Sequence, residues 1–300
     1  MSTRAMLRRL GDLRVPAIGF GSMTITQLPG YDVERGRRTV HAALDAGIRL
    51  FDTADVYGPA GGGDGVNELA LIDALRSWPG SLDDVIVATK GGHTRFPETD
   101  TWWVDGSHKH LRKACIASIG RLGLDPLPLY HHHRPDPRLP YEESILALRA
   151  LWEEGLVMRV GISNVDVGQI DTAHQILGDT LVSVQNEYSP ACRTAEAEIR
   201  ACEERGLAFL SWAPFGGMRH AKTLGGAASP FEEISTRRGI SVHRVALAWQ
   251  LHRSPVVIPI PGASRPESVV DSFAATELNL DPDELAALDP AQLSRKETRS

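Results

Sequence analysis

The chain has 300 residues, a formal net charge of −6, and 42% hydrophobic and 6% aromatic residues, which suits a globular protein with a sizeable core. Its basic residues form no dense cluster, which argues against a nucleic-acid partner because phosphates require a concentrated basic face. Three widely spaced cysteines fit no disulfide framework, and without a signal-peptide core or a bilayer-length apolar stretch we expect a cytoplasmic protein with no membrane partner.

Short β-branched runs alternate with segments of helical periodicity along the chain, as repeated βα units require. The runs predicted as strands cover residues 15–22, 48–54, 85–90, 127–133, 157–164, 181–188, 207–214 and 256–264. The predicted helices include 34–47, which ends on a glycine, 107–123, which begins with a serine suited to N-capping, and the amphipathic segment 141–155. Eight strands and about eight helices predict one (β/α)8 TIM barrel, for which about 250 residues are typical.

Three segments lie outside this alternation. The residues after Leu10 predict an N-terminal β-hairpin across the barrel floor, and 218–239 is long enough to hold an extra turn of helix. The tail at 281–300 is short and ends in charged residues, so we expect much of it to be mobile. No linker divides the chain, and we therefore expect a single domain over 1–300 with its core at about 8–280.

Polar side chains stand at the ends of three neighbouring predicted strands. Asp52 ends the second strand with Tyr57 just beyond it, Lys90 ends the third, and His133 ends the fourth. Chemistry in such barrels takes place at the carboxyl ends of the strands, so these four side chains are predicted to converge. Each has an ordinary alternative as a helix cap, a loop aromatic or a surface lysine, but their coincidence at adjacent strand ends favours a site.

These four side chains also make chemical sense together. A tyrosine is a poor acid at neutral pH, and a neighbouring ammonium is expected to lower its pKa. Asp52 can pair with Lys90 and keep that ammonium charged when it is buried. A histidine can orient a carbonyl oxygen while tyrosine gives or takes the proton. The set suits reduction of a carbonyl group or oxidation of an alcohol, provided that a hydride donor is present.

The stretch "LYHHHRPDP" at 129–137 contains three consecutive histidines. Successive side chains of a strand face opposite ways, so His131 and His133 are predicted to share one face while His132 points towards the helices. Only His133 reaches the strand end. A zinc site would need a third ligand at the same depth, and since no obvious one exists we expect no metal site.

The motifs "FDTADVYG", "VATKGG", "LYHHHRPD", "VGISN", "VQNEYSP" and "IPGASRP" occur in this order. With them the chain resembles the aldo-keto reductases from about residue 8 to residue 280. The resemblance implies a barrel that reduces aldehydes or ketones with NADPH and without a metal. The family's catalytic tetrad falls on the four residues named above, Asp52, Tyr57, Lys90 and His133.

The resemblance also implies a set of cofactor contacts. Ser163, Asn164 and Gln185 look like contacts of the nicotinamide carboxamide, and Trp212 stands where the family places an aromatic ring against the nicotinamide. The segment 262–265 resembles the part that binds the adenosine 2′-phosphate, for which the Arg265 guanidinium is well suited. The full implied set is Asp52, Ser163, Asn164, Gln185, Trp212, Ala213, Pro214, Gly262, Ser264 and Arg265. Alternatively, Trp212 belongs to the core and Arg265 is a solvated helix start.

The chain departs from the family pattern at three positions. Pro128 replaces an acid before the fourth strand, Ser268 replaces a second arginine or histidine, and Ser272 replaces an asparagine for the adenine. Phosphate affinity is therefore expected to rest mainly on Arg265. The glycine cluster at 58–68 lacks a dinucleotide fingerprint and is interpreted as a flexible connection.

Two functions fit this sequence. The first is NADPH-dependent reduction of a small-molecule carbonyl substrate with Tyr57 as general acid, and histidine rather than glutamate at 133 argues against reduction of carbon–carbon double bonds. The second is an NADPH-binding redox-sensing or regulatory subunit with little turnover. In the segment 96–106, Trp102 and Trp103 either line the substrate pocket or pack the loop against the barrel. The substrate and the oligomeric state are left open.

Overall fold

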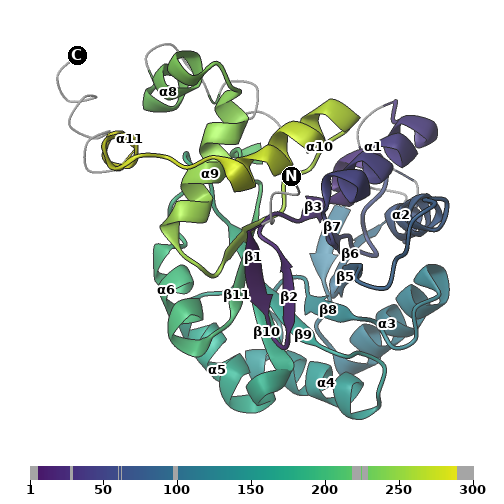
Figure 1. The fold of residues 1–300 in the computed structure, drawn as a ribbon. Helices are drawn as coiled ribbons and strands as arrows, with labels where there is room; N and C mark the ends of the chain where they lie inside the picture. Colours follow the sequence, from purple (N-terminus) through teal and green to yellow (C-terminus); the bar gives the residue numbers. More distant parts are fainter. Residues whose placement is uncertain are drawn as a thin grey trace.

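The structure, a computed structural model, describes residues 6–27, 30–59, 61, 63–96, 101–217, 224 and 229–288. Its main sheet has eight parallel strands in the order β3, β4, β5, β8, β9, β10, β11 and β12 (Figure 1). These span Phe20–Gly21, Leu50–Asp52, Ile86–Gly91, Leu129–His132, Val160–Ser163, Leu181–Glu187, Ala208–Trp212 and Val257–Pro259. The amides of Gly19 and Gly21 donate to carbonyl oxygens of Pro259 and Pro261 at 2.9 and 3.1 Å, which joins the first strand to the last. The predicted (β/α)8 barrel is confirmed.

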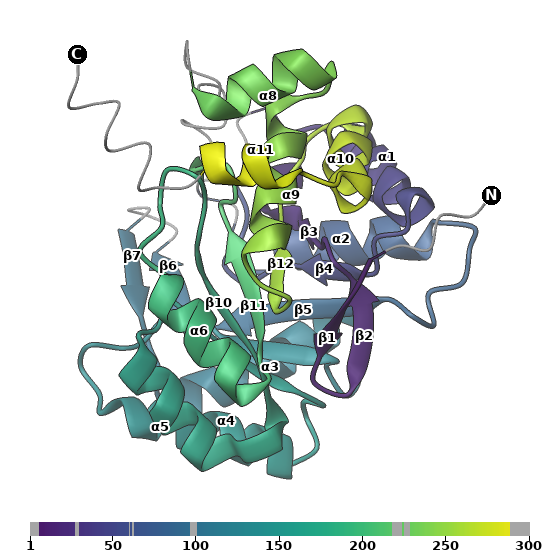
Figure 2. The same ribbon diagram turned by 60° about the vertical axis from the view of Figure 1, so that its left-hand side comes forward.

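Helices cover the outside of this sheet (Figures 1 and 2). They are α1 Val33–Ala46, α2 Val66–Arg76, α3 His108–Leu122, α4 Tyr141–Glu153, α5 Val167–Leu177, α6 Glu196–Arg205, α8 Pro230–Arg238, α9 Val242–Arg253, α10 Pro266–Phe273 and α11 Pro282–Ala287, with 3-10 turns at Ser22–Ile25, Gly178–Thr180 and Ala274–Glu277. The side chain of Ser107 caps α3 by accepting from the amide of His110 at 3.3 Å, and Gly47 ends α1 in the left-handed conformation, as the sequence predicted. None of the described helices is long and apolar enough to cross a membrane.

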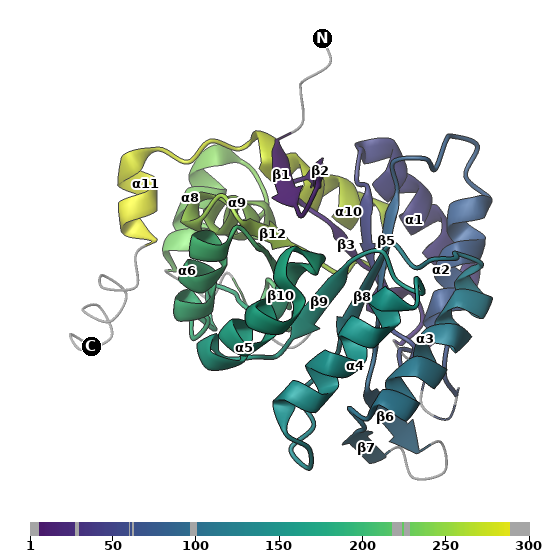
Figure 3. The same cartoon turned by 90° about the horizontal axis from the view of Figure 1, so that it is seen from below.

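Two antiparallel hairpins lie at opposite ends of the barrel (Figure 3). β1 (Leu7–Leu10) pairs with β2 (Leu13–Pro16) and forms the predicted N-terminal hairpin. The predicted strand at 15–22 is wrong in its extent, because β2 ends at Pro16 and the barrel strand begins only at Phe20. β6 (His93–Phe96) pairs with β7 (Thr101–Val104), where the sequence indicated only a loop.

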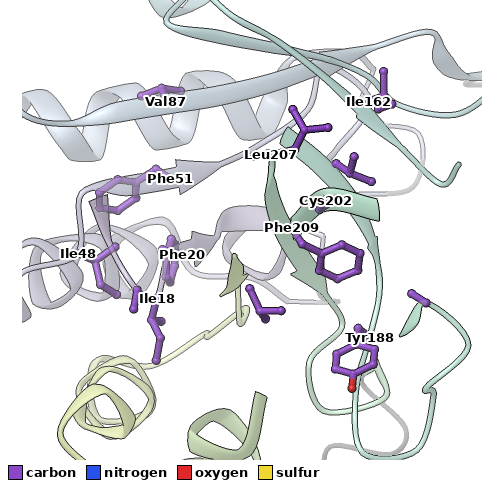
Figure 4. Packing of buried hydrophobic residues seen from close by; sticks show 14 of the residues in the cluster. Ile18, Phe20, Ile48, Phe51, Val87, Ile162, Tyr188, Cys202, Leu207 and Phe209 are labelled. Carbon is purple, nitrogen blue, oxygen red and sulfur yellow. The ribbon is translucent and has the colours of Figure 1, made fainter. Parts of the chain in front are cut away.

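The apolar core has two layers on either side of the strands. The outer layer packs strand residues against the helices; in it the rings of Phe20 and Phe51 lie 5.8 Å apart (Figure 4). The inner layer fills the barrel itself with side chains of the central strands, and Leu10 and Val15 of the N-terminal hairpin join it. Leu50 belongs to the inner layer and Phe51 to the outer one, because side chains alternate along a strand.

The chain after residue 280 begins with a helix, α11, which the sequence analysis did not single out. α11 begins with a capping box between Asp281 and Glu284. The buried carboxylate of Glu284 also accepts from Nε of Arg238 at 2.8 Å, which ties α11 to α8. α8 is the extra helix expected within 218–239. Residues 218–223, 225–228 and 289–300 lie outside the described residues.

Candidate active site

Lys90 lies at the centre of a buried group of polar side chains at the carboxyl ends of β4 and β5. Its Nζ donates to Oδ2 of Asp52 at 2.6 Å and to the carbonyl oxygen of Thr53 at 2.8 Å. The same Nζ lies 3.4 Å from the hydroxyl of Tyr57 and 4.9 Å from the centroid of its ring. Because a buried ammonium needs a counter-charge, Asp52 is the group that allows Lys90 to stay charged there.

His133 joins this group from the next strand. It directly follows β8, and its backbone amide donates to the carbonyl oxygen of Gly91 at 3.0 Å. Its imidazole meets the Tyr57 ring edge-on, with centroids 5.6 Å apart and planes at 84°. β4, β5 and β8 are hydrogen-bonded neighbours. The structure therefore brings together the four side chains that the sequence placed at successive strand ends, while their catalytic roles stay a prediction.

Burial and charge fix the protonation of this group. Burial raises the pKa of the Tyr57 phenol, and although the Lys90 ammonium lowers it, the pKa ends above its ordinary value. The lowering expected from the ammonium is present, but desolvation of the phenolate, which the sequence did not reveal, outweighs it in the protein alone. Burial lowers the pKa of Lys90, but Asp52 and Tyr57 outweigh it and the ammonium is retained. Burial, reinforced by Lys90, holds the pKa of His133 well below its usual range, so His133 is neutral.

The other two histidines of the triplet face opposite sides of β8, as the alternation predicted. His131 lies inside the barrel, with its Nε2 3.0 Å from Oγ of Ser183. Its ring passes over Gly161, where a Cβ atom would lie 2.2 Å from the imidazole. His132 points outwards, and neither of its ring nitrogens has a hydrogen-bond partner among the described residues. Within the described residues, no three His, Cys, Asp or Glu side chains are grouped as metal ligands.

Asn67, which the sequence reasoning missed, anchors the loop before Tyr57. Its Oδ1 accepts from the hydroxyls of Ser22 and Thr53 at 2.5 and 2.7 Å, and its Nδ2 donates to the Ser22 carbonyl and to the Thr26 hydroxyl at 2.9 and 2.7 Å. The backbone amide of Asn67 donates to the carbonyl oxygen of Tyr57 at 3.1 Å. This fully satisfied buried amide links the first two strand ends to α2. The available signal was the Asn-Glu pair that ends the glycine cluster at 58–68. From the sequence, that whole segment was interpreted only as a flexible connection.

Glu68, also missed, braces the same loop from the outer side. It is completely buried; its Oε1 accepts from the hydroxyl of Thr89 at 2.6 Å and its Oε2 from Nε of Arg121 at 2.6 Å. Thr89 immediately precedes Lys90 on β5. The Glu68–Thr89 bond therefore fixes α2 against the strand that carries the buried ammonium, and the Glu68–Arg121 pair joins α2 to α3.

A cavity of about 450 Å³ opens above the buried polar group. Most of the residues implied as cofactor contacts line it, namely Asp52, Ser163, Asn164, Gln185, Trp212, Ala213, Pro214 and Gly262. Ser264 and Arg265 are not among the lining residues; Arg265 is exposed at the start of α10. The structure thus brings one part of the predicted cofactor set to the cavity and leaves the other at a helix start.

Hydrogen bonds hold the polar part of this wall in place. Nε2 of Gln185 donates to Oδ1 of Asp52 at 2.8 Å, and Oγ of Ser163 donates to the carbonyl oxygen of Gln185 at 2.7 Å. Nδ2 of Asn164 donates to the carbonyl oxygen of His133 at 3.0 Å. Within the described chain these bonds leave Oδ1 of Asn164 and Oε1 of Gln185 free to accept from a ligand.

The ends of β9 and β11 have strained backbone, and the end of β11 also has an unused donor. Asn164 and Ala213 adopt φ angles of 60° and 47°, where residues other than glycine are uncommon, and both line the cavity. Trp212 lies beside Ala213, and its buried indole Nε1 has no hydrogen-bond partner in the described part of the chain. Trp212 lines the cavity and is only partly buried, so of its two alternatives the structure disfavours a core side chain.

The β6–β7 hairpin supplies the opposite wall. His93, which the sequence reasoning passed over, has its ring 5.1 Å from that of His133 and 4.9 Å from that of Trp102. His93 and Trp102 line the cavity, whereas Trp103 stacks on Phe96 with ring centroids 3.7 Å apart. The sequence left the places of these two tryptophans undecided; in the structure Trp102 lines the cavity and Trp103 packs within the hairpin. Only the pairing of the two strands reveals this, since both residues follow β5 in the sequence as an apparent loop.

Comparisons with known proteins agree with this fold. The Aldo/keto reductase family profile matches residues 17–292. An uncharacterized oxidoreductase of Schizosaccharomyces pombe is 33% identical over 285 residues, covering 94% of this chain and 88% of its own length. Pyridoxine 4-dehydrogenase of Escherichia coli is 32% identical over 290 residues, covering 93% and 96%. The crystal structure of an aldo/keto reductase from Klebsiella pneumoniae in complex with NADP and acetate is 27% identical, with a TM-score of 0.78 and coverage of 96% of both chains.

Proposed function

We propose that this chain, which belongs to the aldo/keto reductase family, reduces an aldehyde or ketone to an alcohol with NADPH, with Tyr57 as the general acid. The observation that carries this proposal is the contact series from Asp52 through Lys90 to Tyr57, which ends at the wall of a cavity beside His133. It supports the proposal because Tyr57, as proton donor, lines the cavity that a carbonyl oxygen would enter. The Lys90 ammonium would then stabilise the phenolate that remains after Tyr57 has given up its proton.

The wall residues fit the NADPH cofactor that the family implies. Within the described residues Asn164 and Gln185 have free acceptor oxygens for a carboxamide, and Trp212 supplies an aromatic ring to the cavity lining. Gly262 lies open to the cavity, and a Cβ atom there would lie 3.0 Å from Thr24, so a side chain would fill this cradle. When bound, NADPH supplies the hydride for the carbonyl carbon.

The start of α10 fits the phosphate of such a cofactor. No described side chain caps this helix, and Pro266 occupies its first turn, so the backbone amides there have no capping partner among the described residues. Arg265 stands at the N-cap position, is exposed, and makes no ion pair within the described residues. A guanidinium beside uncapped amides suits a phosphate monoester. The serines at 268 and 272 add no charge, which leaves Arg265 as the main cation for this phosphate.

The proton step follows from the protonation states. Tyr57 is protonated at neutral pH because its pKa lies above the ordinary value. Its hydroxyl donates to the carbonyl oxygen as the alcohol forms, and the Lys90 ammonium at 3.4 Å stabilises the resulting phenolate. His133 is neutral and keeps one ring N–H with which to orient the same oxygen. Water then reprotonates Tyr57.

The experiment measures NADPH oxidation with a panel of aldehydes and ketones, including pyridoxal because one relative is a pyridoxine 4-dehydrogenase. Tyr57→Phe is expected to lower kcat by about 10²–10⁴-fold while NADPH binding, followed by fluorescence, is retained. Tyr141→Phe, at the start of α4 and outside the cavity lining, is the matched control and should keep full activity. Equal rates for Tyr57→Phe and the unaltered protein would refute the role of Tyr57. Tight NADPH binding with no oxidation by any carbonyl would favour the redox-sensing interpretation instead.

A further inference from the structure

Arg134 gives the cavity wall a positive charge that the reaction chemistry does not use. It directly follows His133, lines the cavity and is exposed. It makes no hydrogen bond or ion pair with any described residue, whereas Arg138 in the same segment is paired with Asp136. Arg134 therefore presents its guanidinium to whatever enters the cavity.

The balance of charge in the cavity lining singles out this arginine. The only other formally charged side chain of the described lining is Asp52, and Lys90 neutralises it at 2.6 Å. The two lining histidines are neutral: burial, reinforced by Arg134, lowers the pKa of His93 to about 4, and burial also holds that of His133 well below its usual range. Arg134 thus leaves the substrate end of the cavity with one uncompensated positive charge, which attracts an anion and repels a cation.

Aromatic rings line the same cavity as Arg134 and Tyr57. His93 and Trp102 form one wall, with their rings 4.9 Å apart, and Phe215 also lines the cavity. The guanidinium of Arg95 lies 5.0 Å from the centre of the Trp102 ring and donates to the carbonyl oxygen of Pro59 at 2.7 Å, so it holds the tryptophan rather than serving a ligand. Flat aromatic walls suit a planar or apolar segment.

We infer that the substrate is an oxo acid, a carbonyl compound whose aromatic or apolar segment connects the reacting carbonyl to a carboxylate bound by Arg134. This inference rests on the proposed function and names the substrate class of the same site. One unpaired guanidinium matches a monoanionic carboxylate, with which it forms two parallel hydrogen bonds. A phosphate ester would call for a second cation, and the described lining contains none.

The test compares two aldehydes of the same shape, 4-formylbenzoate and 4-formylbenzamide, which differ in charge at the far end of the ring. The ratio of their kcat/KM values measures the preference for the acid. We expect this ratio to exceed about ten in the unaltered protein and to fall about ten- to a hundredfold in Arg134→Gln, as loss of a hydrogen bond to a charged group predicts. Arg149→Gln, on the exposed surface of α4, is the matched control and should keep the original ratio.

Binding provides a second measurement that does not depend on turnover. Calorimetric titration with 4-methylbenzoate, which has no group to oxidise or reduce, in the presence of NADP+ should show binding that Arg134→Gln weakens about ten- to a hundredfold and that Arg149→Gln leaves intact. If both aldehydes are reduced equally well, or if Arg134→Gln lowers both rates alike, the oxo acid inference is wrong and the reductase proposal stands. If neither aldehyde is reduced, the reductase proposal fails for them. The titration then decides the carboxylate site, and binding that is absent or independent of Arg134 refutes it.

Discussion

The two ends of the barrel are built from the same strands but contain opposite kinds of side chain. At the floor, Leu50 and Leu129 fill the interior and the N-terminal hairpin covers them with Leu10 and Val15. Two residues further along β4, the same inward face carries Asp52, which is buried against Lys90. Apolar burial is favourable at one end, while at the other end buried charges must be paired and hydrogen-bonded.

This difference divides stability and chemistry between the two ends. The apolar contacts of the floor need no particular orientation, and their burial offsets the conformational entropy lost when the strands become ordered. The mouth holds an ammonium, a carboxylate and a phenol at fixed distances, which requires the buried braces of Asn67 and Glu68 behind them. A substitution at the mouth is therefore expected to act mainly on rate, and one at the floor mainly on unfolding.

The largest effect is expected from Lys90→Met, which removes the cation of the mouth. The phenolate then loses its stabilising partner, so kcat should fall about 10²–10⁴-fold. Asp52 also loses its counter-charge, although Gln185 still donates to it at 2.8 Å, and the free energy of unfolding should fall by about 3–5 kcal/mol. Steady-state kinetics and urea denaturation measure the two effects. Lys113→Met, on the exposed side of α3, is the control, and a Lys90→Met protein with normal kcat would contradict the assignment.

Leu129→Ala tests the floor. Leu129 is completely buried inside the barrel, and its truncation leaves a cavity that should lower the free energy of unfolding by about 2–5 kcal/mol. The mouth is unchanged, so kcat per folded molecule should stay within about twofold. Leu146→Ala, at an exposed position of α4, should cost much less in the same denaturation experiment. A large loss of kcat in Leu129→Ala at a temperature where it is folded would show that the two ends are coupled.

His132→Leu tests the buried histidine that belongs neither to the apolar floor of the barrel nor to the polar group at its mouth. Burial lowers the pKa of His132 to about 4. In the unfolded chain His132 therefore binds a proton near pH 6.5, whereas in the folded protein it binds one only near pH 4. The free energy of unfolding falls as the pH is lowered from about 6.5 to about 4. With leucine at this position, the free energy of unfolding at pH 4 should fall about 1–3 kcal/mol less than in the unaltered protein, while at pH 7 it should change little. Urea denaturation at both pH values measures this, with the exposed His108→Gln as control. An unchanged acid dependence would mean that His132 is already protonated in the fold.

The pH profile of the rate should show the smallest effect. His133 is neutral because its pKa lies well below its usual range, and Tyr57 is protonated because its pKa lies above its ordinary value. Carbonyl reduction needs both forms, so kcat/KM should be nearly flat from about pH 6 to 9 and should decline only as the pH rises through the pKa of Tyr57. Steady-state assays across this range test the prediction. An inflection near pH 6.5 that disappears in His133→Asn would show a histidine that titrates in the ordinary range.

Local sequence patterns were sufficient for the barrel and for the four residues of its mouth. β-branched runs set the number of strands, and strict alternation along β8 was enough to place His131 and His132 on opposite faces. Side chains at the ends of consecutive parallel strands must converge when the sheet closes. That geometric necessity is why Asp52, Lys90 and His133 could be predicted to meet.

Tertiary structure alone decided the features that depend on contacts between distant segments. The pairing of β6 with β7 brought His93 and Trp102 over the cavity, and no period in the sequence announced it. The net rise in the pKa of Tyr57 depends on how much water the folded loop excludes, which the neighbouring charges alone do not determine. Arg134 is one of many basic residues in the sequence, and only the fold places it in the cavity lining without a partner among the described residues. A sequence records the periodicity that builds strands and helices, but desolvation and unpaired charge exist only once the chain has closed around them.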